Sequence, residues 1–102
     1  MTAACGMDAL TQLIEPLTSL NARPDVDPIC LAGIEMVARS LRTAVKHGDH
    51  LEARADMAAA AFLSGVALSH AGLGAVHGLA GPVGGHAPIP HGMICARLLP
   101  FV

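Results

Sequence analysis

Four side chains of metal-ligand type stand out in this otherwise apolar sequence: Asp8, Gln12, His77 and His91. Asp8 and Gln12 are four residues apart, and residues at that spacing share one face of a helix. His77 and His91 belong to separate segments, and a Gly- and Pro-rich stretch between them is long enough to fold one back on the other. Carboxylate and imidazole donors together suit Fe(II) or Zn(II), with open positions for a substrate oxygen. The residue types therefore predict a metal site in the core of a helical domain.

A simpler interpretation of these residues stays open, because their spacing matches no short metal-binding motif. Each histidine could be a hydrogen-bonded core or surface residue, and Asp8 could be a favourable charge near the start of a helix. The histidines at 47, 50 and 86 fall in or beside predicted loops, where we expect them to be exposed.

The elements that position the four residues are predicted to be helices, because the sequence shows no period-2 alternation of β-branched residues. The first helix covers residues 3–15 and is ended or kinked by Pro16. The second starts with Asp27 as N-cap and Pro28 at its first position, and it stops before Gly48. The remaining helices are expected from Asp49, with a capping-box spacing to Glu52, to residue 71, then over 73–80 and 90–99.

The composition supports one all-α domain with close-packed helices. The chain has 102 residues, of which 53% are hydrophobic and only 14% charged, and Phe62 and Phe101 are its only aromatic residues. Ala, Leu, Val and Met supply the apolar surface, which exceeds what one small domain can bury. We therefore expect a part of a larger protein or an obligate homo-oligomer.

Charge and cysteine content exclude several classes of function. The net charge of −2 and the scattered basic residues give no basis for binding nucleic acid. Three distant cysteines form no metal-binding pair and no disulfide framework, which favours reduced, buried thiols in a cytoplasmic protein. The first residues lack the basic region of a secretory signal.

A membrane hairpin is the remaining alternative for the second half of the chain. Residues 57–96 contain no Asp, Glu, Lys or Arg, a length that could span a bilayer. The same stretch holds four His and three Pro, and polar groups at bilayer depth are costly. We therefore predict a buried core and no membrane partner.

Two motifs resemble those of a known enzyme family. Residues 2–15, TAACGMDALTQLIE, resemble the opening of the helical domain of iron-containing (group III) alcohol dehydrogenases. Residues 72–85, GLGAVHGLAGPVGG, followed by Pro90-His91-Gly92, resemble the family's second signature. The resemblance covers essentially the whole chain. It implies a dehydroquinate synthase-like helical domain and NAD(P)-dependent interconversion of alcohols and aldehydes or ketones. It also implies a metal held by one Asp and two or three His, which carries over to Asp8, His77 and His91.

The sequence departs from the family pattern at two positions. Iron-binding members have His where this chain has Gln12, and they often have His where it has Gly81. Related glycerol dehydrogenases use one Asp and two His, so the resemblance implies Fe(II) or Zn(II) with Gln12 as a further candidate ligand. A proton relay through position 81 is not expected here.

The resemblance also implies that residues 1–102 are part of one helical domain. The family's N-terminal nucleotide-binding domain would precede Thr2 and is absent from this sequence. We therefore expect NAD(P) not to bind this chain alone and the chain alone to be inactive, although the intact family enzyme acts on a small alcohol or carbonyl compound. The alternative is a non-catalytic, self-associating helical module derived from such an enzyme.

Overall fold

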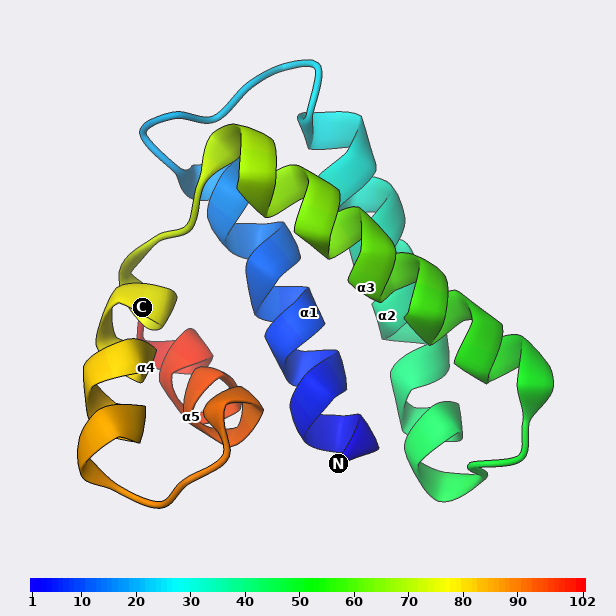
Figure 1. Cartoon of the computed structure of the whole chain (residues 1–102). Coiled ribbons are helices and arrows are strands. Elements are labelled where there is room, and N and C mark those ends of the chain that lie inside the picture. Colours follow the sequence, from blue (N-terminus) through cyan, green and yellow to red (C-terminus); the bar gives the residue numbers. More distant parts are fainter.

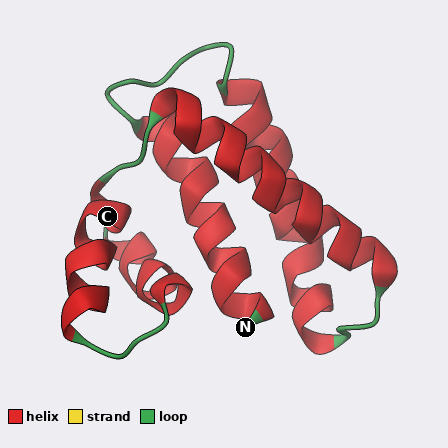
Figure 2. Ribbon diagram, in the orientation of Figure 1, coloured by secondary structure: helices red, strands yellow, loops and turns green.

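The computed structural model describes all residues, 1–102, and contains only helices and connecting loops (Figures 1 and 2). This confirms the predicted all-α class. The elements are α1 (Thr2–Thr18), α2 (Asp27–Lys46), α3 (Leu51–Ala71), α4 (Ala75–His86), α5 (His91–Leu98) and the short 3₁₀ turn η1 (Leu99–Phe101).

Helix α1 is the central element of the fold. Helices α2 and α3 pack against each other and against α1, whereas α4 and α5 form a hairpin on the other side of α1 (Figure 1). The contact between α1 and this hairpin is made mainly by α5. Side chains of α1 can therefore meet those of α4 and α5 although they are far apart in the sequence.

Small side chains make up much of the core. Leu13, Val37 and Ala60 form one buried cluster between α1, α2 and α3. A second cluster lies between α4 and α5 and contains Val76, Ala80, Ile94 and Cys95. A third, around Cys30 and Ala67, joins α2 to α3.

The molecule is flat, with principal extents of 37 × 36 × 20 Å. A helix with its side chains is about 10 Å across, so the short dimension holds only about two helix layers. Most residues therefore lie near a surface, and only 22 of the 102 are buried.

Close backbone approach fixes α5 against α1. Gly92 of α5 faces the backbone of Ala4, and a Cβ at this glycine would collide with the Ala4 carbonyl group. The absence of a side chain thus sets the distance between these two helices. His91 and Cys95 lie on the helix that this contact positions.

Of the two outcomes expected at Pro16, the end of the helix is wrong, and the predicted N-cap of the second helix is also wrong. Helix α1 continues through Pro16 to Thr18, because a proline in the last turn removes only one hydrogen bond near an end that has unpaired groups anyway. At the start of α2 the N-cap is Val26 rather than Asp27, whose side chain makes no capping hydrogen bond. The turn that precedes Val26 is already helical, since the amides of Val26 and Asp27 both donate to the Arg23 carbonyl.

The predicted start of α3 was also one residue too early. His50, not Asp49, is the N-cap, and its Nδ1 accepts a 3.2 Å hydrogen bond from the Ala53 amide. The chain leaves its extended conformation at His50, so an imidazole nitrogen takes the place of the expected carboxylate.

Helix α4 was predicted to stop at residue 80, yet it continues through Pro82 to His86. Proline cannot donate to the carbonyl four residues earlier, which belongs to Gly78. Gly78 and Pro82 are both exposed, so water can solvate the carbonyl that lacks its intrahelical partner.

No single helix is long and apolar enough to cross a membrane. Helices α3 and α4 meet that length and composition test only when joined, and they are bent by 105° at the break between them.

Candidate metal centre

Asp8, His77 and His91 come together from α1, α4 and α5. The His77 Nε2 atom lies 3.0 Å from Asp8 Oδ1, and the His91 Nε2 atom lies 3.7 Å from the same oxygen. The two imidazole rings are 5.2 Å apart between centroids. With Cys95, these residues offer four ligand atoms within 4.8 Å of one another, and we call them the four-donor cluster.

Glu15 orients the His77 ring from the side opposite Asp8. Its Oε2 atom lies 2.5 Å from His77 Nδ1, while Nε2 points to Asp8. A carboxylate only accepts hydrogen bonds, so this contact places a proton on Nδ1. The Nε2 lone pair of a neutral ring is then free to bind a cation, as in the carboxylate–histidine–metal arrangement of many metal sites.

The same carboxylate caps the start of α4. Glu15 Oε1 accepts hydrogen bonds from the backbone amides of Val76 at 2.7 Å and His77 at 3.4 Å. Glu15 is only 4% exposed, so these amides and the positive end of the helix dipole stabilise a buried charge. The N-terminus of α4 and the orientation of its histidine are therefore set by one residue of α1.

Cys95 is the buried member of the four-donor cluster. Its Sγ atom lies 3.5 Å from His91 Nε2 and 3.8 Å from His77 Nε2. Burial, together with the nearby carboxylates of Asp8 and Glu15, raises the pKa of the Cys95 thiol to about 11. A cation bound among these groups would favour the thiolate form of Cys95, because its positive charge stabilises the negative sulfur directly.

Gln12 does not reach His77 or His91 by any hydrogen bond and instead pairs with α3. Its Oε1 atom accepts a 2.9 Å hydrogen bond from the Ser64 hydroxyl group. Helix α3 lies on the other side of α1 from α4 and α5 (Figure 1). Asp8 and Gln12 thus lie on the same helix, but Asp8 contacts histidines of α4 and α5 whereas Gln12 contacts α3.

The chemistry of the cluster fits a divalent cation. Asp8 Oδ1 and the unprotonated Nε2 of His77 are both acceptors when the ring is neutral, so at 3.0 Å they repel each other unless a proton or a cation lies between them. One carboxylate oxygen, two imidazole nitrogens and one sulfur are donors that Zn(II) and Fe(II) accept. His91 is the most exposed of the four, with 47% of its side chain accessible, so the cluster is open to solvent on that side.

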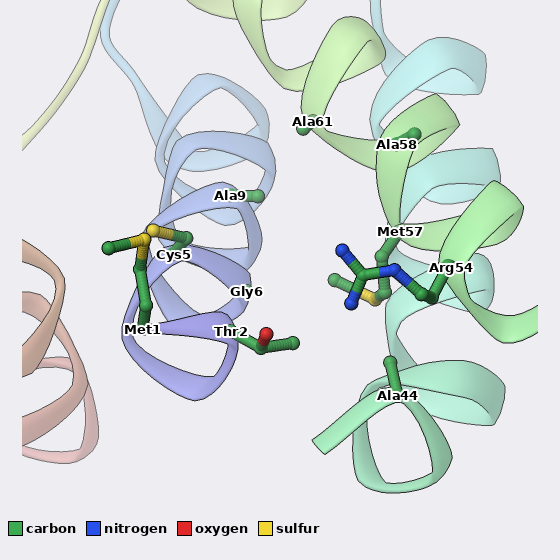
Figure 3. Close-up of a pocket in the computed structure, with 10 residues that line it drawn as sticks. All are labelled: Met1, Thr2, Cys5, Gly6, Ala9, Ala44, Arg54, Met57, Ala58 and Ala61. Atoms are coloured by element: carbon green, nitrogen blue, oxygen red, sulfur yellow. The ribbon is translucent and has the colours of Figure 1, made fainter. Parts of the chain in front are cut away.

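A hollow beside the start of α1, lined mainly by apolar residues, is separate from this cluster. It has a volume of about 290 Å³ and lies between the first turns of α1 and the facing parts of α2 and α3 (Figure 3). Arg54 is its only charged side chain, and no member of the four-donor cluster lines it. We therefore assign it no part in the candidate site.

The sequence analysis missed Glu15 and Cys95, although their spacing carries a signal. Glu15 is seven residues after Asp8, which is two helical turns and the same face. Cys95 is four residues after His91, again on one face. A search for every polar or thiol group in helical register with the proposed ligands finds both.

Comparison with known proteins assigns this arrangement to a family. The model of the Fe-containing alcohol dehydrogenase family, C-terminal part, matches residues 2–102. The chain is 47% identical to long-chain-alcohol dehydrogenase 1 of Geobacillus thermodenitrificans and 46% identical to 1,3-propanediol dehydrogenase of Klebsiella pneumoniae. Both alignments cover 100% of this chain and 26% of the relative, so the chain spans about a quarter of their length.

Solved structures share the same fold over the same stretch. An alcohol dehydrogenase from Oenococcus oeni superposes with a TM-score of 0.96 at 44% identity, over 99% of this chain and 26% of its own. A sulfoacetaldehyde reductase from Bifidobacterium kashiwanohense, solved in complex with NAD⁺, gives a TM-score of 0.94 at 30% identity over 99% and 27% of the two chains.

Proposed function

Because the chain belongs to the iron-containing alcohol dehydrogenase family, as part of its C-terminal helical domain, we propose that it is the metal-binding part of an NAD(P)-dependent alcohol dehydrogenase. The observation that carries this proposal is the convergence of Asp8, His77 and His91, whose ligand atoms lie within 4.8 Å of one another. The substrate class is a small alcohol, with the corresponding aldehyde or ketone as product.

Each residue of the cluster has a distinct task in this proposal. A divalent ion supplies Lewis-acid polarisation of the alcohol or carbonyl oxygen when it is bound. Asp8 supplies negative charge, His77 supplies a nitrogen held in place by Glu15, and His91 supplies a second nitrogen at the exposed edge. Glu15 is a positioning residue, because it acts through His77 and not on the substrate. The half-exposed side of His91 is the side by which substrate enters.

Metal content tests the proposal. We expect about one zinc or iron ion per purified chain after dialysis, and none above background in the Asp8→Ala and His77→Ala variants. Asp49→Ala is the matched control, because Asp49 lies in an exposed turn outside the cluster. Absence of metal from the wild-type protein, or equal content in all variants, contradicts the proposal.

We also propose that residues 1–102 do not bind the nicotinamide cofactor by themselves. They form helices only, and the phosphate-binding loops of dinucleotide domains follow strands. Titration with NADH and NADPH should leave the cofactor fluorescence unchanged. Saturable binding of either cofactor to this chain contradicts this part of the proposal.

A second candidate function is non-catalytic self-association, and exposed apolar surface favours it. A groove of about 510 Å³ on α4 and α5 is lined by six apolar side chains, including Ile89, and by Arg97. Phe62 on α3 is also 72% exposed. Apolar surface of this kind marks protein contacts, and a second copy of the chain is the occupant we propose.

Sedimentation at micromolar concentration separates this candidate from a monomer. We expect a dimer or larger species that Ile89→Lys weakens, whereas Leu20→Lys, at a fully exposed position outside the groove, has no effect. A stable wild-type monomer contradicts self-association.

A further inference from the structure

We infer that the Cys95 sulfur is a fourth protein ligand of the ion held by Asp8, His77 and His91, and that this thiolate makes the site select zinc over iron(II). The inference rests on the proposed metal-binding function and adds a residue and a preferred ion to it. The identity and spacing of Asp8, His77 and His91 do not by themselves predict that residue 95 is a cysteine.

Four of the six donor–donor distances are close to those of a tetrahedral zinc site. For Zn–N near 2.05 Å and Zn–S near 2.3 Å, tetrahedral angles separate nitrogen and sulfur by about 3.6 Å and nitrogen and oxygen by about 3.4 Å. The two sulfur–nitrogen distances in the cluster are 3.5 and 3.8 Å. The two nitrogen–oxygen distances are 3.0 and 3.7 Å, which lie on either side of the expected value. An ion can thus enter with small side-chain adjustments.

The fold holds the sulfur in this position. Cys95 is fully buried and packs in the cluster formed by Val76, Ala80 and Ile94 between α4 and α5. It lies one helical turn after His91, so α5 presents the nitrogen and the sulfur on the same face. The contact of Gly92 with Ala4 in turn fixes α5 relative to Asp8 on α1. The sulfur therefore has little freedom to turn away from the other donors.

The polar side chains of Gln12 and Glu15 on α1 have hydrogen-bond partners of their own. The Gln12 amide oxygen is occupied by Ser64, and Glu15 uses both of its oxygens on α4. Among the His, Cys, Asp and Glu side chains, Cys95 is the only other one with a ligand atom within 4.8 Å of all three ligand atoms. The fourth donor consequently comes from α5 and not from α1.

The donor set decides which ion is preferred. Two histidines and one carboxylate alone are the donor set typical of non-haem iron(II), whereas a set that also includes a thiolate is typical of tetrahedral zinc. Binding forms one sulfur–metal bond and breaks the S–H bond, whose proton passes to solvent, and no oxidation state changes. Because His91 is half-exposed, Asp8, His77, His91 and Cys95 would hold the ion at a place that is accessible from solvent.

Cobalt(II) spectroscopy tests the inference without measuring enzyme activity. Cobalt substitutes for zinc, and a sulfur–cobalt bond adds an intense near-ultraviolet charge-transfer band that oxygen and nitrogen ligands do not give. We expect this band in the cobalt-loaded wild-type protein and in Cys5→Ser, and its loss in Cys95→Ser and Cys95→Ala. Competition with a chelator should show zinc affinity more than about tenfold lower in both Cys95 variants, with a smaller change for iron(II).

The outcomes distinguish this inference from the proposal on which it rests. If wild-type protein binds cobalt without a charge-transfer band, Cys95 is not a ligand, yet the three-residue site stands. If zinc and iron(II) bind equally well to the wild-type protein, the claimed selectivity is wrong. If wild-type protein binds none of cobalt, zinc and iron(II), the proposed function fails and this inference fails with it. The wild-type spectrum decides the matter even if a Cys95 variant does not fold.

Discussion

The carboxylate of Glu15 contacts the His77 ring at 2.5 Å while it also accepts the Val76 amide at the start of α4. One buried side chain of α1 therefore both begins the helix that carries His77 and turns its Nε2 toward Asp8. The two tasks are coupled, because the ring can be oriented only if α4 begins at this place. The candidate site is a consequence of how α1 and α4 join.

Replacing Glu15 with Gln should weaken metal binding without removing a ligand. An amide can present either an acceptor or a donor to each partner, so it cannot serve both the α4 amides and His77 Nδ1 as a carboxylate does. Loss of such an outer partner typically lowers metal affinity by about 10- to 100-fold. Zinc titration with a competing chelator measures this effect. Glu52→Gln, on an exposed position of α3, is the control, and equal affinities in the two variants would refute the role of Glu15.

Zinc should stabilise the folded protein, and the effect should depend on Asp8. Ligand at about 100 times its dissociation constant adds about 2.7 kcal/mol to the free energy of unfolding of a one-site protein. Thermal unfolding with and without zinc, and after chelator treatment, measures the difference. We expect the stabilisation to disappear in Asp8→Asn and to persist in Asp49→Asn. If zinc raises the unfolding temperature of both variants equally, zinc binds at a site that does not include Asp8.

Gly92→Ala should destabilise the protein by disturbing the contact between α1 and α5. The added Cβ meets the backbone of Ala4, which cannot move as a flexible side chain would. Forcing an extra carbon into a packed contact usually costs about 1–3 kcal/mol. Gly65→Ala is the matched control, since nothing lies within 4 Å of that position and alanine in a helix is about 0.5–1 kcal/mol better than glycine. Urea denaturation should therefore give shifts of opposite sign, and a neutral or stabilising Gly92→Ala contradicts the packing described.

The link between α2 and α3 should depend on pH through Asp56. Its carboxylate accepts two hydrogen bonds from Arg39, at 2.8 and 2.9 Å, and a short one from Ser40. These partners lower the pKa of Asp56 from its ordinary value of 3.8 to about 2. Since the unfolded chain binds the proton first as pH falls, the stabilisation is complete above the unfolded pKa and is lost as pH falls through the folded pKa.

The measurement for Asp56 is unfolding as a function of pH. Wild-type stability should fall more steeply between about pH 4 and pH 2 than that of Asp56→Asn, which lacks the titrating group. Asp49→Asn should follow the wild-type curve. Parallel curves for wild type and Asp56→Asn over this range contradict the role of the ion pair.

Local sequence rules predicted the fold class and most of the helices. They failed where tertiary context compensates for a broken local rule. Pro82 does not end α4, since the carbonyl it leaves unpaired belongs to an exposed residue that water can reach, and His50 rather than Asp49 caps α3. The first case depends on the exposure of the Gly78 carbonyl, and the second on His50 Nδ1 facing the Ala53 amide. Neither property can be derived from a short window of sequence.

The candidate site could be predicted only in part for a related reason. Motif resemblance singles out Asp8, His77 and His91, but which side chains complete the group depends on how three helices pack. Gln12 is in register with Asp8, yet Ser64 on α3 holds its amide. The sequence around Cys95 predicts only a buried thiol, and its proximity to Asp8 and His77 depends on how α5 packs against α1 and α4.

Anomalous X-ray diffraction from a zinc-soaked crystal tests the central claim most directly. Data collected on both sides of the zinc absorption edge locate the ion without reference to activity. We predict one strong peak about 2.0–2.3 Å from ligand atoms of Asp8, His77, His91 and Cys95. Zinc bound only at exposed histidines such as His47, with no peak among these residues, would contradict the account.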